Sequence, residues 1–264
     1  MHTICHDTYT PEELTKDNDL YFHMDLHHSF AAESEHIFLK KYVSAKEKLA
    51  DFLKNGKVLI LTLGTAISYK HKSSDTIVGN CHKMPSQLFD KVDLKVKEIR
   101  ETMLKTLEAL KAYNPELKIL FTVSPVRHFK DGLIANARSK ARLIHTVDQL
   151  LTEDATLNYF PAYELLIDEL RDYRFFKKDL VHPNQIAVEF IWEKFLEVHA
   201  TQAVRLQVIK VQKILAAVHH RAFNPKSTQH QKFLKETLNK ITEIESELGD
   251  LFTKEKEQLK AMIV

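Results

Sequence analysis

Residues 58–63 read Val58-Leu59-Ile60-Leu61-Thr62-Leu63, an almost unbroken apolar run that ends at Gly64. Two further runs of this kind, Lys118–Val123 and residues 157–160, follow along the chain. Apolar residues in succession, rather than in alternation, indicate strands buried on both faces, as in a parallel sheet covered by helices. The three runs therefore predict three parallel strands.

Helical patterns fill the segments before these runs, at about residues 34–54, 92–113 and 133–153. Helices that alternate with strands predict an α/β fold with right-handed crossovers. Only a helix and a histidine-rich segment precede residues 58–63, so this apolar strand would lie at a sheet edge. Natural proteins normally cover such edges. We therefore expect one or two strands to be missing from the front of an α/β domain that spans residues 1–198.

The remaining residues, 199–264, predict a C-terminal helical extension. One helix is expected from Pro183 to about His219 with a break near His199, and another from about 227 to 259. Apolar residues recur in the second helix at spacings of three, four or seven, which suits a packed helix face: Leu234, Leu238, Ile241, Leu248 and Leu251. Two interpretations remain open, a helical hairpin packed on its own domain and a coiled coil that joins copies into a homo-oligomer.

Composition excludes several classes of function. The net charge of the 264 residues is +2, which provides no strong field for nucleic acid or an anionic membrane. Two cysteines make a disulfide framework unexpected, and the scarce glycines form no phosphate-binding loop that would hold a cofactor. We expect no signal peptide, and no apolar run of about 20 residues is present. We expect a cytoplasmic protein that acts on a small molecule.

One short stretch has the pattern of catalytic residues, Asp179-Leu180-Val181-His182-Pro183. A proline at the first position of a helix would place His182 at the helix N-terminus, where the dipole disfavours the imidazolium. Asp179, one turn away, could hold the imidazole in one tautomer. Together they would form the base and the orienting group of a nucleophilic triad. The alternative is a helix-capping pair with no catalytic role.

Several longer motifs, in order along the chain from about Tyr21 onward, resemble the GSCFA family, a branch of the SGNH (GDSL-like) hydrolase fold. The resemblance implies a three-layer, flavodoxin-like parallel sheet. The motif that names the family, Gly-Ser-Cys-Phe-Ala with the nucleophilic serine, is absent from this sequence. Its absence agrees with an N-terminally truncated fold. The matching segments are Leu-Thr-Leu-Gly-Thr-Ala (61–66), Gly-Asn-Cys-His-Lys (79–83), Phe-Thr-Val-Ser-Pro-Val-Arg-His (121–128), Tyr-Phe-Pro-Ala-Tyr-Glu (159–164), Asp-Glu-Leu-Arg-Asp-Tyr-Arg-Phe (168–175), residues 179–183 and Ala-Phe-Asn-Pro (222–225).

The resemblance implies an esterase or acyl hydrolase, with O-acylated carbohydrate among its substrates. In that mechanism a serine attacks the ester carbonyl, His182 accepts its proton and Asp179 orients His182. Because the serine motif is absent, we expect little or no esterase activity from this chain. The alternatives are a binding or scaffold module that has lost the chemistry, and a metal-dependent enzyme that uses the N-terminal histidines.

Two segments are expected to hold the oxyanion. SGNH proteins carry a Gly-x-Asn turn, but here Gly64 is followed at the third position by Ala66, so Asn80 is the substitute amide donor. The alternative is that Asn80 and His82 only shape a turn. Cys81 lies between them and is interpreted as a buried thiol rather than a nucleophile.

The segment after the second strand is expected to line the same cleft, because sites form at the carboxyl ends of strands in open α/β sheets. It contributes Ser124, Arg127 and His128. The alternatives are that Ser124 caps a turn and that Arg127 makes a structural ion pair; Ser124 as a replacement nucleophile is least favoured. The basic residues near 127–130 and 138–142 could contact an anion, although most such runs are solvated helix faces.

The N-terminal region is rich in histidine but lacks the spacing of a zinc site, and we expect no bound metal. Its possible ligands are His2, Cys5, His6, His23, Asp25, His27, His28 and His36. His27 and His28 resemble a His-His-Ser segment of the family. They are expected to line the cleft, with surface or structural roles as the alternative.

Overall fold

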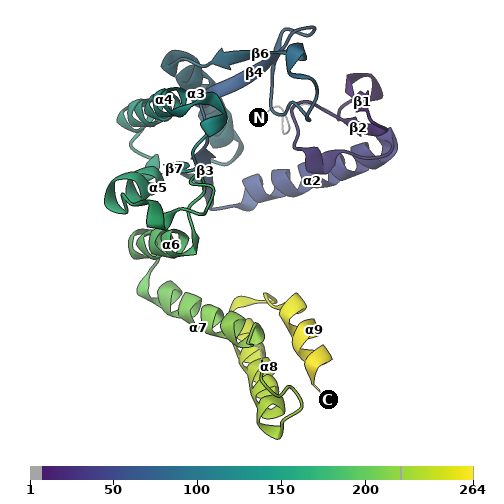
Figure 1. Ribbon diagram of the computed structural model, residues 1–264, viewed down its shortest axis with the longest axis vertical. Helices are drawn as coiled ribbons and strands as arrows, with labels where there is room; N and C mark the ends of the chain where they lie inside the picture. Colours follow the sequence, from purple (N-terminus) through teal and green to yellow (C-terminus); the bar gives the residue numbers. More distant parts are fainter. Residues whose placement is uncertain (1–7, 221, 264) are drawn as a thin grey trace. The chain divides into compact units, whose positions relative to one another are not determined.

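The computed structural model describes residues 8–220 and 222–263 (Figure 1). The chain divides into two compact units, Met1–Ile191 and Trp192–Val264, and the boundary in the sequence falls within helix α6 (Gln185–His199). Within the described residues no helix is long and apolar enough to cross a membrane.

A parallel sheet forms the centre of the first unit. Its strand order is β3-β7-β8, with β3 at Val58–Leu63, β7 at Lys118–Val123 and β8 at Asn158–Phe160. Phe121 of β7 lies opposite a residue of each neighbouring strand, so the three strands are in register. The α/β class and the three parallel strands predicted from the apolar runs are confirmed.

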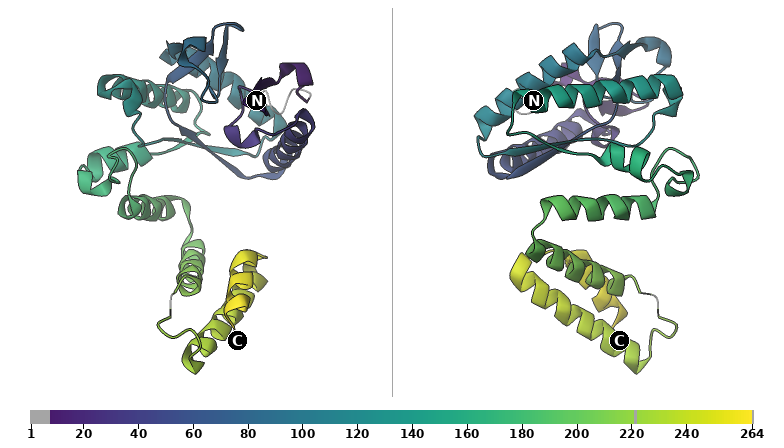
Figure 2. Two further views of the ribbon diagram at one scale, coloured as in Figure 1. Left: turned by 45° about the vertical axis from the view of Figure 1, so that its right-hand side comes forward. Right: turned by 90° about the vertical axis from the view of Figure 1, so that its left-hand side faces the viewer.

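Two helices pack side by side against one face of this sheet, α3 (Val96–Tyr113) and α4 (Leu133–Glu153) (Figure 2). Phe121 is fully buried, which contributes about 2–3 kcal/mol to folding. The helix before the sheet, α2 (Glu35–Asn55), begins at Ser34, whose hydroxyl accepts the Ile37 N–H. The core between helices and sheet contains Leu53, Leu107, Leu110, Leu117, Ile119, Phe121, Val147, Leu150 and Leu157.

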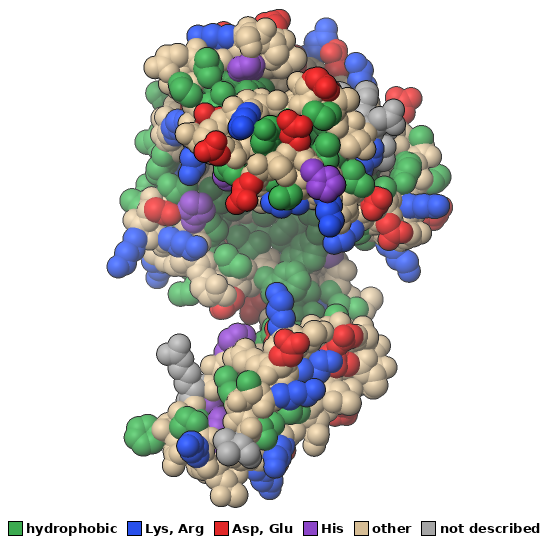
Figure 3. All heavy atoms as spheres, turned by 90° about the vertical axis from the view of Figure 1, so that its right-hand side faces the viewer, with side chains coloured by type: hydrophobic (Ala, Val, Ile, Leu, Met, Phe, Trp, Pro, Cys, Tyr) green, Lys and Arg blue, Asp and Glu red, His purple; other side chains and the backbone are tan. Residues whose placement is uncertain are grey.

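Strand β3 lies at the sheet edge, and its burial alternates along the strand. Leu59 and Leu61 pack against the core, whereas Val58 and Ile60 are 48% and 47% exposed. The prediction of burial on both faces was therefore wrong for β3, although it holds for residues 119–123 of β7. Alternate side chains of a strand point to opposite faces, and only the face toward α3 and α4 is covered here. Hydrophobic side chains also gather in a recess of the first unit in the view of Figure 3.

A second, antiparallel sheet was not predicted from the sequence. Its order is β5-β4-β6, with β4 at Ile67–His71, β5 at Thr76–Val78 and β6 at Phe89–Asp93. A short hairpin, β1 (Thr15–Asp17) and β2 (Leu20–Phe22), precedes α2. The expectation of one all-parallel sheet holds for the central sheet alone. The helix expected from residue 92 begins later because β6 occupies its first residues.

After the end of α6, the described residues of the second unit form α7 (Gln202–Val218), α8 (Thr228–Leu248) and α9 (Thr253–Met262). The break expected near His199 is present. Helices α7 and α8 pack against each other, as the predicted hairpin requires. The helix expected to run to about residue 259 instead ends at Leu248, where Gly249 adopts a φ of 86°, and α9 follows. Glycine tolerates this left-handed region at little cost, which suits a helix end. The core of this unit contains Ile214, Val218, Leu234, Ile241, Ile244, Phe252 and Leu259, whereas Leu251 is exposed.

Candidate functional site

The Asp–His loop, residues 177–184, is a closed turn ahead of α6. The Lys177 N–H donates to the His182 carbonyl over 2.8 Å, and the Leu180 N–H donates to the Lys177 carbonyl over 2.9 Å. Leu180 adopts a φ of 58°, in the left-handed region that is costly for a side chain with a Cβ. The loop therefore has a defined conformation in which strain is offset by hydrogen bonds.

Within this loop, Asp179 and His182 are hydrogen-bonded to each other. Asp179 Oδ2 lies 2.7 Å from His182 Nδ1, and Asp179 Oδ1 accepts the N–H groups of His182 and Val181 over 3.0 and 2.9 Å. These bonds, the backbone N–H of His182 foremost, lower the pKa of Asp179 to about 2. The carboxylate is then ionised and can only accept, so Nδ1 of neutral His182 carries the proton. The lone pair is left on Nε2.

The structure places Pro183 outside the helix. Pro183 forms an isolated bridge with Phe176, and α6 begins two residues later at Gln185. Asn184 is the cap, since its Oδ1 accepts the Ala187 N–H over 3.1 Å. The prediction of proline at the first helical position was therefore wrong, because an asparagine side chain makes the better cap. His182 lies three residues before the helix, and its side chain is 53% exposed.

The carboxyl ends of β3 and β7 are joined by side chains of α4, which we name the strand-tip brace (Ser139 and Lys140). Lys140 Nζ donates to the carbonyls of Gly64 and Ser124, each over 2.6 Å. Ser139 Oγ accepts the Ala66 N–H over 2.7 Å. Ser139 and Lys140 are each 1% exposed. Burial lowers the pKa of Lys140 to about 8.

The brace was missed in the sequence analysis. Residues 138–142 were interpreted as a solvated helix face or an anion contact, yet Ser139 and Lys140 are buried. The signal that was available is their spacing from the apolar residues Leu143 and Val147, which places all four on one side of α4. A lysine at such a position indicates a buried ammonium that must find carbonyl partners.

His128 lies next to the brace. A Cβ on Gly64 would lie 4.0 Å from His128 Nε2, and the His128 N–H donates to Asn136 Oδ1 over 2.9 Å. Burial, and then the charge of Lys140, lower the pKa of His128. The structure thus brings Gly64, Ser124 and His128 together at the strand ends, as expected from their positions after the strands.

Arg127 joins this segment to the Asp–His loop. Its N–H donates to the Val181 carbonyl and its Nη1 donates to the Leu180 carbonyl, each over 3.4 Å. The predicted base, the orienting carboxylate and Arg127 therefore share one region of the first unit. The structural ion pair weighed for Arg127 is absent from the described residues, where its guanidinium lies against aromatic rings and a backbone carbonyl.

Ser124 has the geometry of a turn residue. Its hydroxyl accepts the Val126 N–H over 3.3 Å, and its backbone N–H donates to the Leu63 carbonyl over 2.9 Å. In the part of the chain that the structure describes, no serine, threonine or cysteine side chain is hydrogen-bonded to His182. The geometry thus provides a base and its orienting group, without a nucleophile in contact with them.

Asn80 and His82 contact the N-terminal segment. Asn80 Oδ1 accepts the His82 N–H over 2.8 Å, and His82 Nε2 lies 3.0 Å from the His23 carbonyl. The His82 ring stacks on Phe22 at 4.1 Å, and burial lowers its pKa. These contacts match the turn-shaping alternative, and the oxyanion role of Asn80 stays a prediction. Desolvation likewise raises the pKa of Cys81, which disfavours the reactive thiolate.

The other histidines also make local contacts. His27 caps the short 3₁₀ helix His28–Phe30, since its Nδ1 accepts the Ser29 N–H over 3.2 Å. The His28 ring lies 5.8 Å from His82. Across residues 8–220 and 222–263, no group of three or more histidine, cysteine, aspartate or glutamate side chains could hold a metal ion. Three residues of the metal hypothesis lie outside the described residues, His2, Cys5 and His6.

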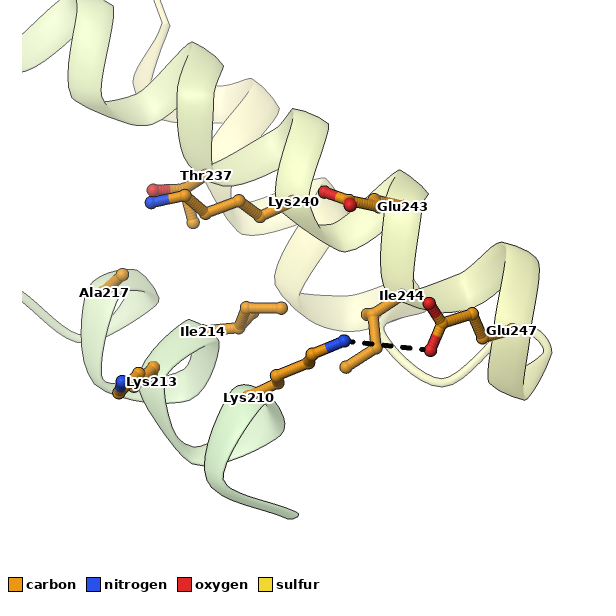
Figure 4. A pocket seen from close by; sticks show the side chains of 9 residues that line it. All are labelled: Lys210, Lys213, Ile214, Ala217, Thr237, Lys240, Glu243, Ile244 and Glu247. Carbon is orange, nitrogen blue, oxygen red and sulfur yellow. Dashed lines mark ion pairs between the residues drawn. The ribbon is translucent and has the colours of Figure 1, made fainter. Parts of the chain in front are cut away.

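A groove in the second unit offers no comparable chemistry (Figure 4). It lies between α7 and α8, with Ile214 and Ile244 on its floor and Lys210 paired with Glu247 at 4.0 Å on its rim. Its lining side chains include no histidine, serine or cysteine. The candidate active site is therefore the Asp–His loop with the neighbouring strand ends.

Comparison with known proteins agrees with the motifs. The model of the GSCFA family matches residues 1–195, and that of the GSCFA domain protein, C-terminal domain, matches residues 211–264. No curated protein and no solved structure gives a match. The two family models share the name GSCFA, and together they match residues of both units.

Proposed function

Because this chain belongs to the GSCFA family, we propose that its first unit contains the base of an SGNH-type ester-hydrolase site. His182 Nε2 takes a proton from the attacking group and returns it to the leaving alcohol, while Asp179 holds the imidazole in the required tautomer. The observation that supports this proposal is the 2.7 Å hydrogen bond between Asp179 and His182. Two backbone N–H groups fix the carboxylate that makes this bond.

In this proposal the chain by itself hydrolyses esters slowly or not at all. The Gly-Ser-Cys-Phe-Ala motif is absent from the sequence, and no described hydroxyl or thiol is hydrogen-bonded to His182. Loss of a triad serine can lower turnover about a million-fold, and the remaining groups then provide only weak residual activity. The substrates remain esters, with O-acylated carbohydrate as the class that the resemblance implies.

An added nucleophile tests the proposed role of His182. With hydroxylamine and an unactivated methyl ester, the hydroxylamine nitrogen attacks the carbonyl, its N–H proton passes to His182, and the C–O bond breaks as methanol leaves with that proton. The product is a hydroxamate, which gives a coloured iron complex. We expect hydroxamate formation by the wild-type chain above the protein-free rate and its loss in His182→Gln. Equal rates for both proteins would overturn the proposal.

A second candidate function is a binding module that keeps the cleft and lacks the chemistry. The observation in its favour is that the half-exposed His182 side chain is bonded to Asp179 and to no described nucleophile. Calorimetric titration with a non-hydrolysable amide analogue of the ester separates the two. Binding without hydroxamate formation would favour the module, and hydroxamate formation would favour the enzyme.

A further inference from the structure

A small cavity of about 220 Å³ opens beside the Asp–His loop in the first unit. Its apolar wall comes from Leu166 and Ile167, which belong to the π-helical turn Leu165–Glu169. Its other lining residues are Arg127, Arg171, Asp172, Tyr173 and Phe176. A π-turn is uncommon and frequently marks a functional site. The residues that line this cavity therefore bear on which ligand the site accepts.

The guanidinium of Arg127 is held in place in this cavity. It lies 4.3 Å from the ring centroid of Phe176, 5.4 Å from that of Tyr173 and 5.7 Å from that of Phe129. One of its N–H groups donates to the Leu180 carbonyl. Aromatic packing and this bond fix the plane of the guanidinium, so little side-chain entropy is lost when a ligand binds.

The cavity carries more positive than negative charge. Within the described part of the chain no carboxylate lies within ion-pair distance of Arg127 or Arg171. The one acidic residue in the lining, Asp172, is already engaged, because its carboxylate accepts the Arg174 N–H over 2.7 Å and lies 3.4 Å from Arg174 Nε. Arg171 has a φ of 30°, a strained conformation for a residue with a side chain. Two guanidinium groups thus share a cavity whose carboxylate is satisfied elsewhere.

The cavity adjoins the proposed base. Arg127 is bonded to the backbone of Leu180 and Val181, and Phe176 pairs with Pro183, the residue after His182. Its walls therefore contact the Asp–His loop on both sides of residue 182. A substrate that extends from the cavity to the loop would place one group on Arg127 and its ester at His182.

We propose that Arg127, assisted by Arg171, binds an anionic group of the substrate, a carboxylate or a phosphate, so that the preferred ester is an acidic one. A planar guanidinium offers paired N–H donors that match the oxygens of either group. The volume suits a group of a few heavy atoms, because each water occupies about 30 Å³ in the liquid. The ester part of this inference rests on the proposed function, whereas the anion site can be tested without turnover.

The test is titration of the full chain with acetate and, separately, with inorganic phosphate, followed by the NMR signals of the arginine Nε–H groups. We expect a saturable shift of the Arg127 signal and binding roughly 10- to 100-fold weaker in Arg127→Gln. The tighter of the two anions identifies the headgroup. Arg171→Gln, at an exposed position, is expected to weaken binding less and remains informative if Arg127→Gln fails to fold.

Arg138→Gln is the matched control, since it removes one positive charge from an exposed position of α4 outside the cavity. Anion binding that is equal in the wild type, Arg127→Gln and Arg171→Gln, or weakened equally by Arg138→Gln, would overturn the inference. Anion binding without hydroxamate formation would leave this inference standing and sink the proposed function. Monomethyl succinate carries a free carboxylate and dimethyl succinate does not. Hydroxamate formation at equal rates from both would overturn the anion inference and leave the proposed function standing.

Discussion

The strand-tip brace and the Asp–His loop hold neighbouring parts of the first unit by opposite means. Ser139 and Lys140 are buried, and their bonds to backbone groups that follow β3 and β7, those of Gly64, Ala66 and Ser124, replace bonds to water. Asp179 and His182 are about half exposed, and their bonds compete with water. Buried polar groups are costly to leave unpaired, whereas exposed ones are not. Substitution in the brace should therefore affect stability, and substitution in the loop should affect chemistry.

The largest expected effect is on chemistry, from His182→Gln. Hydroxamate formation should fall about 100-fold, the lower range for loss of a general base. The free energy of unfolding in urea should change by less than about 0.5 kcal/mol, because the side chain is exposed. His145→Gln on α4 serves as a control at another exposed histidine. A large loss of stability in His182→Gln would show that the loop is structural and would remove the contrast.

The second effect is a pH dependence of stability that arises from Lys140. Its pKa in the folded chain is about 8, below the ordinary 10.5, so between these values the unfolded chain binds more protons. Stability therefore rises with pH in this window, by about 2 kcal/mol from about pH 7.5 to 9.5. Urea unfolding of the wild type should show this rise, and Lys140→Met should lack it.

The matched control for this series is Lys105→Met, on the exposed face of α3. It should keep the rise. Burial also raises the pKa of Tyr9 to about 12 and raises that of Tyr163, and these groups lower stability only where tyrosines begin to ionise. A rise of the same size in Lys140→Met would show that the ammonium is not the cause.

The same contrast explains what the sequence could predict. Lys118–Val123 is a largely apolar run, and the burial of its residues on both faces followed from that pattern alone. The alternating burial of β3 did not follow, because an identical apolar pattern occurs in a central strand and in an edge strand covered on one face. The β4-β5-β6 sheet was missed because its residues are mixed in polarity and pair only with one another.

The candidate site shows a similar division. Asp179 and His182 could be paired from their spacing, since three residues within a tight turn bring two side chains together. The link from Arg127 to Leu180 joins residues 53 positions apart, and no local pattern indicates it. The contact of Lys140 with Gly64 likewise depends on how α4 packs across the sheet. Long-range contacts of this kind follow from the fold rather than from a motif.

A third prediction concerns the other half of the brace, Ser139. Ser139→Ala leaves the buried Ala66 N–H without an acceptor, which should cost about 1–3 kcal/mol in urea unfolding. Ser124→Ala is the matched control, because its hydroxyl makes a longer bond, 3.3 Å, at a half-buried position. We expect it to cost less than about 1 kcal/mol. Equal costs would mean that burial does not distinguish the two serines.

A smaller effect, on the pH dependence of stability, should come from Asp179→Asn. The pKa of Asp179 is about 2 in the folded chain and 3.8 in its ordinary state, so its stabilising contribution is present above about pH 3.8 and is lost as the pH falls toward 2. The difference in unfolding free energy between wild type and Asp179→Asn should therefore narrow from about pH 5 to pH 3. Asp148→Asn, at an exposed position of α4, should show no such narrowing.

Acyl transfer by Asp179→Asn, rather than its stability, separates the two roles weighed for the pair. A capping carboxylate and an orienting carboxylate both stabilise the loop through the backbone N–H groups of Val181 and His182. Only the orienting role requires that hydroxamate formation fall when the carboxylate becomes an amide that can donate to Nδ1 and so move the proton to Nε2. The difference in unfolding free energy between wild type and Asp179→Asn could narrow toward low pH while acyl transfer stays unchanged. That result would assign the pair to capping alone.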